Sequence, residues 1–342
     1  MQLALGMGYW SSGPPADAPA QIAAAERLGF DSIWTAEAYG SDALTPLAWW
    51  GSATERIGLG TAICQISART PAAMAMAALT LDHLSGGRFR LGLGASGPQV
   101  VEGWYGQPYP KPLARTREYV EIIRQILARD KPVSYDGDHY QLPHPGGTGL
   151  GKPLKSTVHP LRSEIPLYLG AEGPKNVAMT AEIADGWLPL FFSPKDNDFY
   201  HEALSEGFAR PGARRSFDDF DVAAVVPVVI NDDVETAADA IRPLLALYAG
   251  GMGAKEANFH LDVFARMGFE AACARIQDMY LAGDKKSASA AVPTEMVEAV
   301  ALVGPPAKIA DDLAAWEESV VNTLVVSGPV PLLEAVADIV LG

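Results

Sequence analysis

The sequence is poor in cysteine and histidine, and this scarcity narrows the chemistry that it can carry. Its 342 residues include two cysteines, Cys64 and Cys273, which are far apart and form no C-x-x-C pair. The six histidines include no pair at i, i+4 spacing, which is the arrangement that zinc peptidases use on a helix. We therefore expect no metal site, no redox-active cysteine motif, and thiols that stay reduced.

Basic residues are also scarce. Lysine and arginine together number 26 against 41 aspartate and glutamate residues, which gives a formal net charge of −15. An acidic surface disfavours both nucleic acid and an anionic membrane as partners. The expected partner is therefore a small-molecule substrate, and any anionic cofactor must be held by a local electropositive pocket.

Long apolar runs are missing as well. No stretch of the sequence approaches the roughly 20 apolar residues that a membrane-spanning helix needs. The first ten residues, MQLALGMGYW, lack a basic segment, and their apolar run is too short for a secretion signal. The expectation is a cytoplasmic protein.

What the sequence does contain is an alternation of short apolar runs with longer helical runs, which is typical of a parallel sheet with crossover helices. Eight strands are predicted, at residues 3–8, 31–37, 57–64, 88–95, 165–170, 185–190, 221–230 and 323–327. Eight such units predict a (β/α)₈ TIM barrel that forms one domain over residues 1–342. An open doubly wound sheet is the alternative, but its G-x-G-x-x-G turn fails here at the third glycine, where Ser11 stands.

One long stretch without periodicity lies between the fourth and fifth predicted strands. It covers about residues 136–164 and is rich in glycine, proline and histidine. Because it is too long for a plain connector, we interpret it as a functional insertion in the barrel.

Chemistry in such a barrel sits at the carboxyl ends of the strands. The fourth strand ends in a glycine-containing turn, residues 93–98 (LGASGP), whose backbone N–H groups could cradle a phosphate. Residues 170–174 (GAEGP) form a similar turn after the fifth strand. Either turn could equally be an ordinary strand-to-helix connection. Glu37, at the end of the second strand, could act as an acid, a base or a hydrogen-bond acceptor, or simply form a salt bridge.

Several segments, spread in order over most of the chain, resemble the luciferase-like monooxygenase superfamily. The resemblance is greatest to the branch that uses the deazaflavin coenzyme F420. The segments are residues 29–37 (GFDSIWTAE), 56–106, 116–124 (TREYVEIIR), 137–143 (GDHYQLP), 165–175 (IPLYLGAEGPK), 184–187 (ADGW) and 303–313 (VGPPAKIADDL).

The resemblance implies a (β/α)₈ barrel with an insertion, a homodimer packed through the second and third helices, and F420 as cofactor, with FMN as the alternative. It also implies a non-prolyl cis peptide bond at Ala62–Ile63, which forms a bulge behind the cofactor ring. The cofactor-binding residues that it implies are Glu37, Ala62, Ile63, Cys64, Gly94, Ala95, Ser96, Gly97, Pro98, Gly170, Ala171, Glu172 and Gly173.

The chain departs from the family pattern at one position. Some sugar-phosphate and alcohol dehydrogenases of this branch place a catalytic histidine directly after the acidic residue, where this chain has Ala38. Hydride delivery from reduced F420 to an activated C=C, C=O or C=N bond is therefore the favoured reaction. The candidate proton donors are Glu37, Tyr39 and His139, and the candidate walls of the substrate pocket are Met7, Trp10, Trp187 and Phe191.

Two other functions fit the same residues. One is a two-component FMN monooxygenase, which shares the fold and in which reduced FMN reacts with oxygen. The other belongs to a different class, a non-catalytic protein that binds a flavin or deazaflavin, because the histidine of the dehydrogenases is missing.

Overall fold

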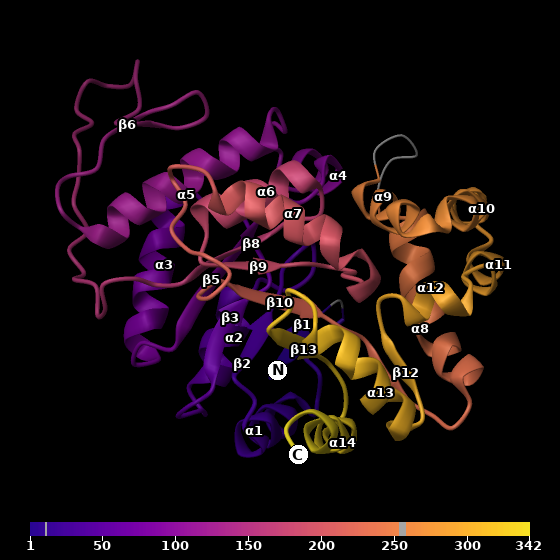
Figure 1. Ribbon diagram of the computed structural model, residues 1–342. Helices are drawn as coiled ribbons and strands as arrows, with labels where there is room; N and C mark the ends of the chain where they lie inside the picture. Colours follow the sequence, from indigo (N-terminus) through magenta and orange to yellow (C-terminus); the bar gives the residue numbers. More distant parts are fainter. Residues whose placement is uncertain (11, 253–257) are drawn as a thin grey trace.

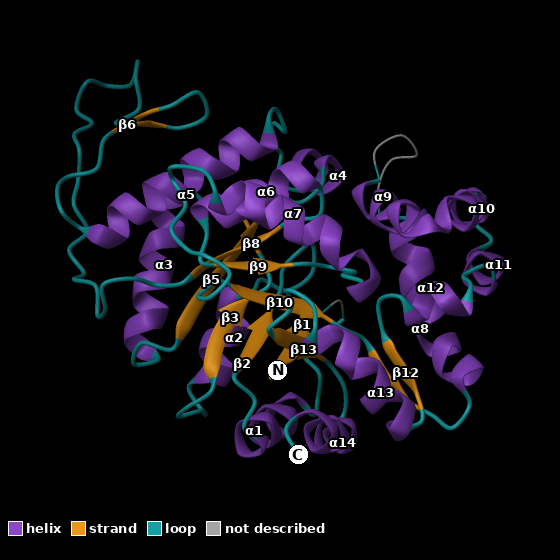
Figure 2. Ribbon diagram, in the orientation of Figure 1, coloured by secondary structure: helices purple, strands orange, loops and turns teal. Residues whose placement is uncertain are grey.

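The core of the molecule is a closed barrel of eight parallel strands (Figure 2). The structure is a computed structural model that describes residues 1–10, 12–252 and 258–342. Its barrel strands are β1 (Gln2–Gly8), β2 (Ser32–Thr35), β3 (Gly58–Thr61), β5 (Phe89–Gly94), β8 (Leu167–Gly170), β9 (Gly186–Leu188), β10 (Asp221–Val225) and β13 (Thr323–Val326). Pairing of Leu59 in β3 with Phe89 in β5 closes the ring. The predicted barrel is confirmed.

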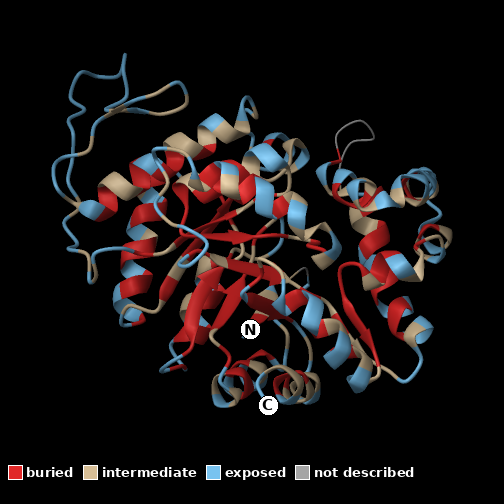
Figure 3. Cartoon of the chain, viewed as in Figure 1, coloured by how far each residue is buried: buried red, intermediate tan, exposed pale blue. Residues whose placement is uncertain are grey.

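Two apolar layers lie on either side of the strands, because side chains alternate between the barrel interior and the helices outside. A small interior cluster includes Ala4, Trp34, Tyr168 and Val325, whereas the larger core packs beneath the helices. The middle of each barrel strand is buried (Figure 3). The surrounding helices are α1 (Ala18–Leu28), α2 (Leu44–Gly51), α3 (Pro71–Leu84), α4 (Pro98–Gly103), α5 (Pro112–Ala128), α6 (Pro174–Ile183), α7 (Asn197–Phe208), α13 (Pro306–Glu317) and α14 (Val330–Val340). No helix in the described ranges is long and apolar enough to cross a membrane.

The insertion after α5 lies where the sequence predicts it. Its ordered part is a small antiparallel hairpin of β6 (Tyr135–Asp136) and β7 (Gln141–Leu142). In Figure 1 it projects away from the barrel at the outer side of α5. The carboxylate of Glu118 in α5 accepts hydrogen bonds from the backbone N–H groups of Asp138, His139 and Tyr140 and so fixes the hairpin to that helix.

A second excursion separates β10 from β13 and forms a unit with its own apolar core. It comprises β11 (Val228–Ile230), α8 (Val234–Gly250), α9 (Phe259–Phe264), a π-helical turn η2 (Ala265–Phe269), α10 (Glu270–Leu281), α11 (Lys285–Ala290), α12 (Thr294–Glu298) and β12 (Leu302–Gly304). Strands β11 and β12 pair with each other in a separate two-stranded parallel sheet.

The prediction of one continuous strand over residues 221–230 is therefore wrong. Strand β10 leaves the barrel ladder after Val225, and Pro227 follows within two residues. Because proline has no N–H group to donate, a central strand does not continue through it. The carbonyl of Pro227 instead accepts a hydrogen bond from Leu302 N at 3.0 Å, which starts the β11–β12 pair.

The barrel wall has no room for a side chain at Gly92. A Cβ atom there would lie 1.7 Å from the carbonyl oxygen of Thr61, so Gly92→Ala must push two strands apart. We expect the substitution to lower the free energy of unfolding by about 3 kcal/mol, measured by urea denaturation. Gly103→Ala, where nothing lies within 4 Å of the added Cβ, is the control, and equal stability of the two variants would contradict this packing.

Candidate active site

The third strand is interrupted at its carboxyl end. Strand β3 stops at Thr61, the Ala62–Ile63 peptide bond is cis as predicted, and β4 (Cys64–Gln65) then resumes pairing with β5. The hydroxyl of Thr61 replaces the lost ladder contacts, because it accepts from Gly92 N and donates to Gly92 O, both at 2.9 Å. We call residues 61–65 the bulge.

The side chain of Ile63 lies across two glycines on neighbouring strands. A Cβ at Gly94 would be 2.7 Å from Ile63 Cδ1, and a Cβ at Gly170 would be 3.4 Å from Ile63 Cγ2. The bulge therefore fits against the ends of β5 and β8 because both positions lack side chains. The three strand ends form one continuous surface at the mouth of the barrel.

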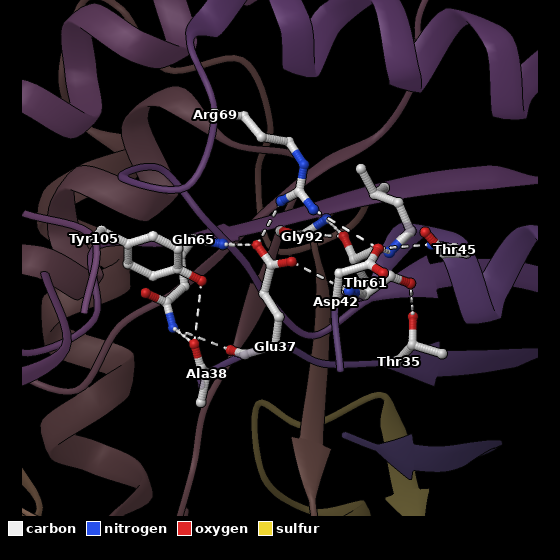
Figure 4. A network of polar contacts seen from close by, with 12 residues as sticks. Thr35, Glu37, Ala38, Asp42, Thr45, Thr61, Gln65, Arg69, Gly92 and Tyr105 are labelled. Carbon is white, nitrogen blue, oxygen red and sulfur yellow. Dashed lines mark hydrogen bonds and ion pairs between the residues drawn. The ribbon is translucent and has the colours of Figure 1, made fainter. Parts of the chain in front are cut away.

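The carboxylate of Glu37 holds the bulge in place (Figure 4). Its Oε1 accepts hydrogen bonds from Gln65 N at 2.8 Å and from the Arg69 guanidinium at 2.7 Å, and its Oε2 accepts from Ala43 N at 3.2 Å. Glu37 is buried, so these bonds lie out of bulk solvent. One side chain thus ties the bulge to the start of α2.

These contacts give Glu37 a positioning role. Both carboxylate oxygens accept hydrogen bonds from N–H donors of the protein, one of them a guanidinium. The acid role expected of Glu37 stays a prediction. The Gln65 amide and the Tyr105 hydroxyl both donate to Ala38 O, at 3.3 and 3.1 Å, and extend the network to the next residue.

The turn after β5 has the form expected of an anion-binding loop. Ser96 has a left-handed backbone with φ of 59°, and the Tyr109 hydroxyl donates to its carbonyl at 2.8 Å. Within the described ranges, the backbone N–H groups of Ala95, Ser96 and Gly97 donate to no protein acceptor. They remain available to a ligand.

Buried polar atoms without partners lie on the chain that follows the bulge. Among the described residues, neither Ser67 Oγ nor Gln65 Oε1 has a hydrogen-bond partner. Ser67 lines a small hollow together with Ala95, Tyr109 and Arg115. Because buried polar groups are normally paired, the unpaired Ser67 hydroxyl indicates a place for a polar ligand beside the turn.

Cys64 and the turn after β8 contribute differently. The Cys64 thiol is fully buried in the core, and burial raises its pKa, so only the backbone of this residue can face a ligand.

In the turn after β8, Ala171 O accepts a hydrogen bond from Trp187 Nε1 at 2.8 Å, and Glu172 O accepts one from Arg266 at 3.1 Å. The carbonyls of this turn are thus occupied by protein donors.

Three of the predicted pocket walls face the helical layer. Trp187 is fully buried against Tyr200, with ring centroids 5.0 Å apart, so the prediction that it lines a pocket is corrected to a packing role. Met7 and Trp10 are half-buried, and the Trp10 ring packs on Trp50 of α2. Phe191, which has a left-handed φ of 61°, is also buried, and its ring packs edge-on against His260.

The three predicted proton donors are not brought together. Glu37 is buried in its network, and Tyr39 is 56% exposed on the loop after β2. His139 belongs to the β6–β7 hairpin outside α5 (Figure 1), where its backbone N–H donates to Glu118. The structure does not place His139 with the residues of the bulge.

A histidine that the sequence did not single out lies at the mouth instead. His260 of α9 has its Nδ1 2.7 Å from Glu172 Oε1. The ring meets those of Tyr248 and Phe191 edge-on, with centroids 4.9 and 6.2 Å away. No local pattern connects these residues, because Glu172 and His260 are 88 positions apart, so only the fold reveals the pair.

The comparisons with known proteins agree with this architecture. A family model described as luciferase-like monooxygenase matches residues 4–323. The chain belongs to this family. It is 57% identical over 329 residues to a protein of Mycobacterium tuberculosis named "Putative coenzyme F420-dependent oxidoreductase", with 96% of this chain and 95% of the relative covered. It is also 30% identical over 308 residues to 5,10-methylenetetrahydromethanopterin reductase of Archaeoglobus fulgidus, covering 90% of this chain and 87% of that protein.

Two solved structures superpose on nearly the whole chain. Coenzyme F420-dependent tetrahydromethanopterin reductase from Methanopyrus kandleri matches with a TM-score of 0.82 and 26% identity, covering 100% of this chain and 99% of the other. An F420-dependent secondary alcohol dehydrogenase matches with a TM-score of 0.75 at 18% identity, covering 99% of this chain and 98% of the other, which shows the shared fold. With these relatives, the protein is an oxidoreductase.

The Glu37 network can be tested through stability. Glu37→Gln keeps the shape of the side chain but removes its charge and turns an amide NH₂ toward N–H donors. We expect a loss of about 2 kcal/mol in the free energy of unfolding, because hydrogen bonds to a buried charged group are lost.

The matched control is Glu334→Gln, which removes an exposed ion pair with Arg27 and should cost less than about 0.5 kcal/mol. Urea denaturation of both variants measures the difference. A Glu37→Gln variant as stable as its control would show that the carboxylate does not hold the bulge.

Proposed function

We propose that the protein is an F420-dependent oxidoreductase that transfers a hydride between the deazaflavin and a small organic substrate. The observation that carries the proposal is the bulge, with Ile63 seated on Gly94 and Gly170 at the barrel mouth. The name of the relative in Mycobacterium tuberculosis and that of the Methanopyrus kandleri structure support F420-dependent chemistry in this family.

The residues present fit such a cofactor. The surface made by Ala62, Ile63 and Cys64 would lie behind the flat ring and support it. This surface is continuous because Gly94 and Gly170, at the ends of β5 and β8, have no side chains that would displace Ile63. The free N–H groups of the turn after β5, residues 95–97, would hold a phosphate. Arg115 and the unpaired Ser67 hydroxyl, beside that turn, would supply positive charge and a hydrogen bond in an otherwise acidic protein.

The cofactor, when bound, supplies the hydride; the protein orients and shields it. Glu37 and Arg69 fix the backbone of the bulge through Gln65 N, so the support behind the ring is rigid before anything binds. The loops after β1 and β2, which carry the exposed Tyr9 and Tyr39, would cover the opposite side. Such preorganisation lets a site position two reactants without reorganising during the reaction.

Cofactor binding is the first test. We expect the purified protein to quench F420 fluorescence with an affinity at least about tenfold higher than for FMN, a difference of about 1.4 kcal/mol. Gly94→Ala, which forces Ile63 to shift, should weaken F420 binding about tenfold while the fold is kept; Gly103→Ala is the control.

Preference for FMN would contradict the proposal and favour an oxygen-using monooxygenase. Tight F420 binding without turnover over a broad panel of substrates would favour a non-catalytic binding protein.

We also propose that the chain forms a homodimer through α2 and α3. Trp49 on α2 is 78% exposed, and Met76 and Leu84 on α3 are 63% and 74% exposed. Large exposed apolar side chains that gather on neighbouring elements are typical of association surfaces, and tryptophan and methionine are enriched in them.

Sedimentation velocity tests the dimer. We expect the protein to sediment at twice the 36.2 kDa chain mass and Trp49→Glu combined with Met76→Glu to sediment as a monomer, because a buried charge opposes association. Leu281→Glu, at an apolar residue of α10 that is 51% exposed, should leave the dimer intact. Dissociation by the control variant, or none by the double variant, would contradict the assignment.

A further inference from the structure

The mouth of the barrel holds an acid–base pair to which nothing above assigns a role. Glu172 follows β8 by two residues, next to the Gly170 on which Ile63 is seated. Its Oε1 lies 2.7 Å from His260 Nδ1, and the two side chains are only 16% and 22% exposed. The pair therefore lies mostly out of solvent and on the same rim as the bulge.

The hydrogen bonding of this pair is incomplete. His260 Nδ1 and Glu172 Oε1 form an ion-pair contact, but within the described part of the chain neither His260 Nδ1 nor Glu172 Oε2 has a hydrogen-bond partner. Buried polar atoms without partners are costly in a folded protein. Such unpaired atoms indicate that a ligand supplies the missing hydrogen bonds when it enters the site.

The surroundings leave His260 as the group best placed to exchange a proton. Tyr248 of α8 packs edge-on against it, and burial raises the Tyr248 pKa to about 12, so this phenol keeps its proton at neutral pH. Tyr9 and Tyr39 come from the loops after β1 and β2 and lie close enough to influence Tyr248 electrostatically. The Arg266 guanidinium from η2 is engaged with the backbone carbonyl of Glu172.

We propose that His260 is the proton donor of the reaction and that Glu172 positions it. This inference rests on the proposed function and narrows the substrate to a polar double bond, a ketone or a neutral imine. The substrate carbon gains a hydride, with its electron pair, from reduced deazaflavin, which is thereby oxidised. The substrate oxygen or nitrogen takes the proton from His260 Nε2, the ring nitrogen opposite Glu172. The imidazole then regains a proton from solvent.

The position of His260 explains how the chain can dispense with a histidine after Glu37. Ala38 offers no titratable group there, and Glu37 is saturated by N–H donors. The excursion between β10 and β13 supplies the imidazole, which lies beside Glu172 after the end of β8.

The experiment combines a binding readout with a rate readout on the full-length protein. F420 binding is measured first, by fluorescence. The imidazole ¹⁵N resonances of His260 should then shift on addition of F420, whereas those of His201, an exposed histidine stacked on Phe217, should not.

Single-turnover oxidation of reduced F420 is then followed with cyclohexanone and with 1-pyrroline as probe substrates. We expect His260→Ala to bind F420 within twofold of the unmodified protein but to react about 100-fold more slowly. Added imidazole should restore the rate. The unmodified rate should fall as pH rises and the donor loses its proton, and this dependence should be lost in His260→Ala. His201→Ala should behave as the unmodified protein in every readout.

Three results would overturn the assignment. They are unshifted His260 resonances in the F420 complex, an unchanged rate in His260→Ala, and a lost rate that imidazole does not restore. Failure of the unmodified protein to reduce either probe would overturn the choice of a polar double bond. Failure to bind F420 would show itself in the first measurement as a failure of the proposed function, and the donor role would be withdrawn with it.

Discussion

The structure of the site depends on one buried carboxylate. Glu37 binds the backbone of the bulge through Gln65 N, the first turn of α2 through Ala43 N, and the guanidinium of Arg69. Backbone bonds from Ala62 N to Thr35 O and from Glu37 N to Ile63 O, together with the β4–β5 pairing, hold the bulge against its neighbours. The buried carboxylate, which accepts from three donors, adds a side-chain connection to this backbone support. The glycine at the end of each neighbouring strand then lets Ile63 close the surface.

The two excursions from the barrel have different relations to this surface. The β6–β7 hairpin is fixed to the outside of α5 by Glu118 and lies away from the mouth. The unit between β10 and β13 brings α8 and α9 to the rim, where Tyr248 and His260 meet Phe191 and Glu172. The barrel and the bulge thus form the surface that would support a cofactor. The unit between β10 and β13 contributes side chains that could contact a substrate.

Much of this arrangement could be predicted from the sequence. Alternating apolar runs predict the eight strands, and the glycines of residues 93–98 predict a turn where the backbone is accessible. The resemblance to the family predicts the cis bond at Ala62–Ile63, which the structure contains. These features are local, or they rest on motifs that can be compared directly.

The remainder depends on contacts between distant parts of the chain. The side chain of Trp187 points outward, toward the helices, because of the register of β9. This strand has only three residues, and a shift of its register by one residue would turn the Trp187 side chain to the barrel interior. The pairing of β11 with β12 joins segments more than 70 residues apart, and that of His260 with Glu172 joins residues 88 apart. Pro227 marks an early end of the seventh strand, but no local pattern predicts that the chain goes on to pair β11 with β12.

The most direct test is a crystal structure of the protein with F420 bound. The account predicts that the deazaflavin ring lies against Ala62–Cys64, that the phosphate accepts hydrogen bonds from the N–H groups of residues 95–97, and that His260 faces the ring across the substrate pocket. A ring bound away from the bulge, or a His260 side chain shielded from the ring by protein, would contradict it.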